Sequence, residues 1–247
     1  MWKNHRTIRV NLWIEHKLNI KLRAFLDSPT AQLFPYGDDI YGNVPINFNF
    51  NYYNFNFTQL IINTNGYIFF SGSKCCQIKF PSLANGIAAL NYDLNTNSFG
   101  EIVYENLNSS SSDFEQIKTY LNILPTKLFR ISFVNVPDYA TETLDASFQI
   151  ILATDYSKFK VLLIYYGCLN GSTLLTPAGI YYLAKNGAQL SSNLSTNPCT
   201  DSNLEKKVNG VWVFETGQTD SNFTKYIFFL LSIITLLTNS SNYDIND

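Results

Sequence analysis

Histidine is the residue that this 247-residue chain lacks most clearly: it has only His5 and His16, and residues 33–247 contain none. Ser-His-Asp and Cys-His catalysis and histidine-built zinc sites are therefore excluded from that region. The usual general base near neutral pH is missing as well, so an enzyme would have to work with carboxylates, tyrosine or lysine alone. We expect a protein that is not an enzyme and that needs no cofactor.

Charged residues are also scarce. They make up 15% of the chain, with a formal net charge of −2, whereas about a quarter of a typical globular domain is charged. No overall basic field is present to attract nucleic acid, so no nucleic-acid partner is expected. Hydrophobic residues make up 46%, which is enough for a sizeable core.

The chain has four cysteines and no Cys-x-x-Cys pair, so little favours a zinc ribbon or a thioredoxin-like site. Cys168 and Cys199 flank a stretch rich in Asn, Ser and Thr, which favours a loop-closing disulfide between them. Cys75 and Cys76 are adjacent, so a bond between these two would be strained. The rival pairing joins them to the other two cysteines, and buried free thiols are the remaining alternative.

Six Asn-x-Ser/Thr sequons are acceptors for N-linked glycans if the chain is secreted. They lie at Asn56, Asn108, Asn170, Asn193, Asn222 and Asn239. A chain so rich in asparagine and serine also produces such triplets by chance. We predict glycosylation at two or more of them.

The two ends of the chain differ from its middle. Residues 1–32 are basic, and their apolar residues are interrupted by polar ones, so they form no clear signal peptide; an incorrectly assigned first exon is the alternative. Residues 218–247 form a tail with an apolar segment from Tyr226 to Leu237. As a helix it would measure about 18 Å against about 30 Å of hydrocarbon core. We therefore expect membrane contact without a comfortable span, or a final core element.

Between these ends, short apolar or alternating runs separated by Asn, Gly, Ser and Pro predict β-strands. Phe48, Phe50 and Tyr52 alternate with Asn, and a bend or bulge is expected before the next strand. Asn65-Gly66 separates two apolar runs and predicts a tight hairpin turn in which both residues have positive φ. Further strands are expected over 86–92, 101–105, 127–136, 146–153, 159–166, 178–184 and 211–214.

One helix interrupts the strands. Ser112 fits the N-cap of a capping box that Glu115 would close. Apolar residues then recur at helical spacing until Pro125 ends the run. The sequence predicts a helix over 112–124 that covers a sheet.

A weak metal signal follows the predicted hairpin. Oxygen-bearing side chains alternate at Asp93, Asn95 and Asn97, as they do in a calcium-binding loop. The glycine and the glutamate that an EF-hand requires further along are missing, so a polar turn is the favoured interpretation. Asp38 and Asp39 could also donate oxygens, or form an Asx-type turn.

A more specific signal begins at residues 33–37, Leu-Phe-Pro-Tyr-Gly. These residues resemble the opening motif of the NIDO domain, the extracellular domain of nidogens, alpha-tectorin and several mucin-like and sushi-domain membrane proteins. Residues 60–70, LIINTNGYIFF, resemble the hairpin of that family. Further blocks follow in the family's order over 87–93, 100–104, 129–136, 147–155, 178–180 and 210–214.

Together with the predicted strands and helix, the resemblance implies a mainly β, sandwich-like antiparallel domain over 33–217 with one substantial helix. It also implies an extracellular or cell-surface, non-catalytic module in cell–matrix adhesion, whose partner is a matrix or cell-surface protein or glycan. A carbohydrate-binding module is the alternative, and a carboxylate-only hydrolase is less favoured. We expect exposed aromatic residues to contact the partner, with Tyr36, Tyr139 and Tyr182 as examples.

Overall fold

The structure is a computed structural model. It describes residues 30–53, 55–71, 84–140, 145–167, 178–183, 189–194, 198–199, 201–206 and 208–217. Several predictions lie outside these residues: those on the basic N-terminal segment, on Cys75, Cys76 and Cys168, on the sequons at Asn170, Asn222 and Asn239, and on the segment from Tyr226 to Leu237. Within the described ranges, no helix has the length and apolar character needed to cross a membrane.

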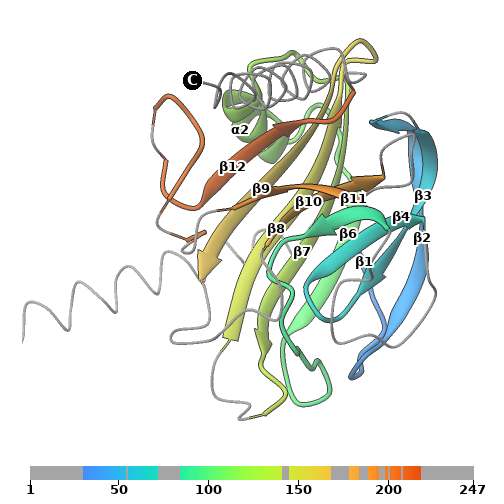
Figure 1. The fold of residues 1–247 in the computed structure, drawn as a ribbon, viewed down its shortest axis with the longest axis vertical. Coiled ribbons are helices and arrows are strands. Elements are labelled where there is room, and N and C mark those ends of the chain that lie inside the picture. The colour runs from blue at the N-terminus through green and yellow to red at the C-terminus, as the bar shows by residue number, and fades with distance from the viewer. Residues whose placement is uncertain are drawn as a thin grey trace, which may run out of the picture.

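The described residues form two antiparallel sheets of six strands each (Figure 1). The first sheet has the order β1-β6-β7-β8-β9-β12, and the second has the order β11-β10-β5-β4-β3-β2. The strands are β1 Gln32–Leu33, β2 Tyr41–Tyr52, β3 Phe55–Asn63, β4 Tyr67–Ser71, β5 Asn85–Ala88, β6 Glu101–Asn106, β7 Lys127–Pro137, β8 Asp145–Thr154, β9 Phe159–Gly167, β10 Gly179–Leu183, β11 Gln189–Asn193 and β12 Val211–Glu215. The predicted mainly β, sandwich-like class is confirmed.

The main core lies between the two sheets and is built by alternation along the strands. In β2, Phe48, Phe50 and Tyr52 point inward and are at most 7% exposed, while the asparagines between them face outward. Phe50 stacks on Phe70 of β4, with 5.9 Å between ring centroids. Burying each such side chain contributes about 1.5–3 kcal/mol, so the period-2 pattern of β2 specifies which of its faces enters the core.

The β2–β3 and β3–β4 hairpins of the second sheet differ in detail from the sequence prediction. The expected irregularity after Tyr52 is a turn between two separate strands, because Tyr52 pairs with Phe55. The predicted hairpin between β3 and β4 is confirmed, with Asn63 paired to Tyr67. Gly66 has φ +82°, but Asn65 does not have positive φ. The connection is therefore a three-residue loop with glycine in the left-handed position, and not a two-residue turn.

The single described helix, α2 (Ser112–Leu121), lies on the outer face of the first sheet (Figure 1). Its N-cap is Ser111, one residue before the predicted Ser112, and the Ser111 side chain accepts a hydrogen bond from the Phe114 amide at 3.1 Å. Glu115 pairs with Lys118 and does not close a capping box. Asn122 takes the left-handed conformation that ends the helix, so it stops before the predicted residue 124.

Candidate functional site

Four connecting segments, far apart in the sequence, meet at one end of the sandwich, which we call the loop end. The loop end consists of residues 36–40, 64–66, 91–100 and 138–140. Two isolated antiparallel bridges join these segments, one between Asp38 and Asn95 and one between Leu94 and Asp138. The Tyr139 amide also donates to the Asp93 carbonyl at 2.9 Å. Backbone pairing therefore holds the loop end in place.

Asn65, predicted only as a turn residue, links three of these segments. It is fully buried, and its Oδ1 accepts a hydrogen bond from the Leu94 amide at 2.9 Å. Its Nδ2 donates to Oδ1 of Asp39 at 2.6 Å, and its amide donates to Oδ1 of Asn63 at 2.8 Å. Sequence reasoning missed this role because both remote partners come from other segments of the chain.

Carboxylates gather at the loop end. Oxygens of Asp38, Asp39 and Asp93 lie within 4.8 Å of one another, and Asp138 is only 2% exposed. Burial, and then the neighbouring Asp39, raise the pKa of Asp38 above its usual range. Burial, and then Asp38, Asp39 and Asp138, raise the pKa of Asp93 in the same direction. The Oδ1 atom of Asp38 is buried without a hydrogen-bond partner, so the cluster is electrostatically unfavourable as it stands.

The three residues that the sequence suggests as metal ligands, Asp93, Asn95 and Asn97, have different surroundings in the structure. Asp93 lies with Asp38 and Asp39, a set of carboxylates that could hold a hard cation. Asn95 is 5% exposed, and its Oδ1 accepts a hydrogen bond from the amide of Asn97 at 2.8 Å. Asn97 itself is exposed. The Asn95–Asn97 contact is an Asx-type turn, which matches the polar-turn interpretation of this stretch.

Exposed aromatic side chains lie in the same segments as the carboxylates. Tyr36 is 47% exposed, Tyr139 is 51% exposed and Phe99 is 44% exposed, and all three belong to the loop end. Tyr182, the third expected contact residue, is only 4% exposed and stacks on Tyr53 at 3.5 Å between ring centroids. The expectation for Tyr182 is wrong, because its alternating position in β10 points its ring into the core.

The remaining predicted positions lie elsewhere. Cys199 is disulfide-bonded, and the other three cysteines lie outside the described residues, so the pairing with Cys168 stays a prediction. Asn56 and Asn108 are both exposed. Asn193 belongs to β11, and its side chain is not described.

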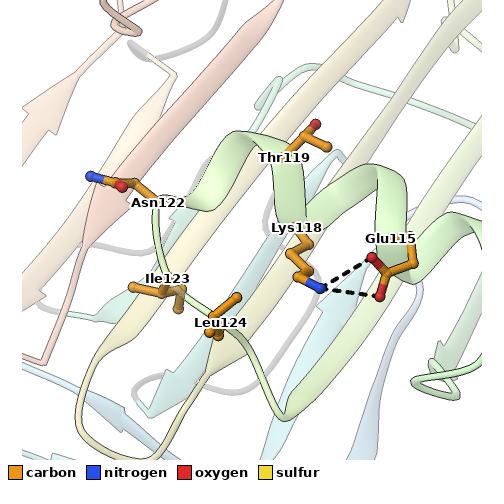
Figure 2. A pocket seen from close by; sticks show the side chains of 6 residues that line it. All are labelled: Glu115, Lys118, Thr119, Asn122, Ile123 and Leu124. Atoms are coloured by element: carbon orange, nitrogen blue, oxygen red, sulfur yellow. Dashed lines mark hydrogen bonds and ion pairs between the residues drawn. The ribbon is translucent and has the colours of Figure 1, made fainter.

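A shallow hollow of about 430 Å³ lies at the C-terminal end of α2 (Figure 2). Glu115 and Lys118, which both line it, form an ion pair along the helix at 3.1 Å, and Leu124, another lining residue, is 72% exposed. The charges of the pair neutralise each other and the hollow is open to solvent, so it offers no converging polar groups for a ligand.

Comparison with protein families gives a match over residues 24–218 to the family described as NIDO related. The match includes the loop end and both sheets. No curated protein and no solved structure matches the chain.

Proposed function

Because this chain belongs to the NIDO-related family, as its sequence motifs indicate, we propose that it is an extracellular, non-catalytic adhesion module. It binds a matrix or cell-surface protein through the loop end. The observation that carries the proposal is the gathering of Tyr36 and Tyr139, each about half exposed, on loops held rigidly by cross-bridges. Tyrosine is among the side chains that are enriched at protein interfaces and at their hot spots.

The chemistry of the loop end supports binding in preference to catalysis. Its four segments contain no lysine, arginine, histidine or cysteine. Four aspartates therefore face no cation within these segments, and the segments offer neither a histidine base nor a cysteine nucleophile. A partner that brings hydrogen-bond donors or basic side chains would complement this surface. Membrane association through the segment from Tyr226 to Leu237 stays a separate prediction.

Surface plasmon resonance against a panel of purified matrix and cell-surface proteins tests the proposal. Tyr139→Ala and Tyr36→Ala should each weaken binding about tenfold or more, the loss typical of an interface hot spot. Tyr156→Ala is the matched control. Tyr156 is 57% exposed in the turn between β8 and β9, at the opposite end of the first sheet.

Two results would contradict the proposal. One is a bound partner whose affinity is unchanged in both loop-end variants. The other is hydrolysis of a glycoside or ester that Asp93→Asn abolishes, because the carboxylates would then act as catalytic groups.

A further inference from the structure

A second, smaller cavity lies between α2 and the first sheet, and it shares no residue with the loop end. It measures about 160 Å³ and is only partly open. One wall is formed by Asp113, Gln116, Ile117 and Tyr120, which recur at the spacing of one helical face. The opposite wall and the floor come from β8, β9, the turn before β12 and the first residue of β12: Gln149, Ile164, Tyr165, Tyr166, Val208, Asn209 and Val211.

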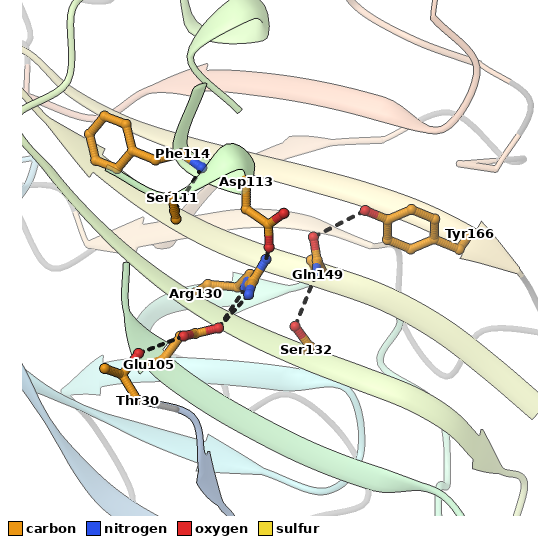
Figure 3. A network of polar contacts seen from close by, with 9 residues as sticks. All are labelled: Thr30, Glu105, Ser111, Asp113, Phe114, Arg130, Ser132, Gln149 and Tyr166. Carbon is orange, nitrogen blue, oxygen red and sulfur yellow. Dashed lines mark hydrogen bonds and ion pairs between the residues drawn. The ribbon is translucent and has the colours of Figure 1, made fainter. Parts of the chain in front are cut away.

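The polar groups of this cavity are held by buried partners (Figure 3). Arg130 is 1% exposed and donates from its terminal nitrogen to Oδ2 of Asp113 at 2.8 Å. Glu105, also buried, holds the other side of the guanidinium. The Asp113 carboxylate is therefore fixed at the cavity wall, because the side chain that orients it cannot move into solvent.

The floor is fixed in the same way. Gln149 is 1% exposed, its Nε2 donates to the Ser132 hydroxyl at 3.0 Å, and its Oε1 accepts from the Tyr166 hydroxyl at 3.2 Å. Burial raises the pKa of Tyr166, so the phenol keeps the proton that it donates to Gln149. Tyr166 is therefore held in place among the residues that line the cavity.

The charge and size of the cavity narrow the class of ligand. Arg130 pairs with both Asp113 and Glu105, so its single positive charge compensates Asp113 only in part. Asp113 is the only carboxylate of the described lining, so the cavity has one weakly negative wall whose carboxylate accepts hydrogen bonds from a neutral ligand. The described lining contains no lysine or arginine to bind an anion. A volume of about 160 Å³ holds about five waters at about 30 Å³ each, well below the several hundred Å³ of typical drug-sized sites. A small, neutral and polar ligand fits these limits.

We propose that this cavity binds one neutral sugar residue. A sugar ring has hydroxyls that both donate and accept, and a C–H face that packs against an aromatic ring. Gln116 and Asn209 offer amides of both polarities, and Asp113 offers a second carboxylate oxygen. Tyr120 and Tyr166 offer the aromatic faces. The site does not depend on the adhesion proposal, since the two surfaces use different residues.

Titration of the full chain with methyl glycosides of glucose, galactose, mannose and N-acetylglucosamine, followed by saturation-transfer difference NMR, tests the site. We expect at least one sugar to bind with a Kd on the order of 1 mM, as befits so small a contact. Gln116→Ala and Asn209→Ala alter exposed side chains and should leave the thermal melt unchanged. Each should raise that Kd about fivefold or more.

Thr119→Ala, an exposed position on another face of α2, is the matched control and should bind like the unaltered chain. Tyr139→Ala should also keep sugar binding, so a failed adhesion test leaves this result intact. The proposal would be overturned if none of the four sugars bound at a concentration ten times the expected Kd. Equal binding by the unaltered chain, Gln116→Ala and Asn209→Ala would overturn it as well. Saturable binding of methylammonium without binding of any sugar would also overturn it, because the cavity would then select a cation.

Discussion

At the scale of single residues, the positions that matter most at the loop end are small or uncharged. Asn65 is fully buried and joins three segments by hydrogen bonds. Gly66 follows it with φ +82°, and its carbonyl accepts hydrogen bonds from the amides of Ala89 and Leu90. The hairpin that the Asn-Gly pair predicts is thus also the support of the neighbouring segment, which explains why the loop end can be rigid without regular structure.

Replacing Gly66 with valine should destabilise the fold. A β-branched residue tolerates positive φ poorly, and a Cβ at this position would lie 3.1 Å from Cβ of Leu90. We expect a loss of about 1–3 kcal/mol, which lowers the melting temperature by about 2–4 °C per kcal/mol. Gly66→Asn should lose less, since asparagine adopts the left-handed region more readily. Identical melts for the unaltered chain and Gly66→Val would disprove the strain argument.

At the scale of elements, short-range patterns in the sequence predict most strands and the helix but not how they meet. The alternation from Phe48 to Tyr52 and the hairpin at Asn65-Gly66 depend on neighbours in the chain, so the sequence is enough to predict them, although not the three-residue length of the hairpin loop. The bridge between Asp38 and Asn95 depends on the pairing of whole sheets. β5 ends at Ala88, not at residue 92, because the following residues turn into the loop end. β1 and β11 went unpredicted, since their sequences carry little apolar alternation.

The sequence likewise does not predict that a charged residue, Arg130, is buried. Arg130 stands in an apolar strand and would ordinarily mark an exposed position. Its carboxylate partners Glu105 and Asp113 come from β6 and α2, so only the folded arrangement shows that the charge is compensated. The candidate site beside α2 depends on the same contacts, which is why no motif in the sequence indicates it.

The ion pairs of Arg130 should matter far more to stability than the exposed pair on α2. Arg130→Ala leaves the buried Glu105 carboxylate without its charge partner, and we expect a loss of about 3–5 kcal/mol. Lys118→Ala removes an ion pair of similar length from the helix surface and should cost less than about 1 kcal/mol. Urea denaturation of the two variants measures this difference in stability. Similar denaturation midpoints for Arg130→Ala and Lys118→Ala would contradict the prediction.

The turn between β8 and β9 makes a contribution to folding stability that depends on pH. Hydrogen bonds from the Ser157 hydroxyl, and then from the Lys158 and Ser157 amides, lower the pKa of Asp155 below its usual value of 3.8. A carboxylate whose pKa is depressed by folding stabilises the protein above the unfolded value, and this stability is lost as the pH falls through the folded value.

Asp155→Ala should therefore destabilise the chain by about 1 kcal/mol near neutral pH. The difference from the unaltered chain should shrink as the pH falls below 3.8. Melting curves from pH 7 to pH 3 measure it, with Asp201→Ala, an exposed aspartate, as the control. A difference that grows with acidity would show that the sign of the shift is wrong.

At the scale of the whole molecule, the two sheets enclose the main core, and the two candidate binding sites lie outside that core. The loop end joins connections from both sheets, while the cavity beside α2 lies on the outer face of the first sheet. An adhesion partner and a sugar residue would therefore bind different parts of the surface. The adhesion proposal also requires the chain to meet its partner outside the cell, and this compartment has its own chemical signature.

That signature is N-linked glycosylation, which we predict at Asn56 and Asn108 when the chain passes through a secretory pathway. Asn56 is exposed beside the turn between β2 and β3, and Asn108 is exposed in the turn before α2, so both are accessible on the folded surface. Asn56→Gln and Asn108→Gln should each remove one glycan from the intact mass of a secreted product, and enzymatic deglycosylation should remove the remainder. Each variant loses only exposed hydrogen bonds, from Asn51 to Asn56 or from Ser110 to Asn108, so its melting temperature after deglycosylation should stay within a few degrees of that of the unaltered chain treated in the same way. A secreted product whose mass equals that of the bare polypeptide would contradict the prediction and remove one of the main reasons to place this chain outside the cell.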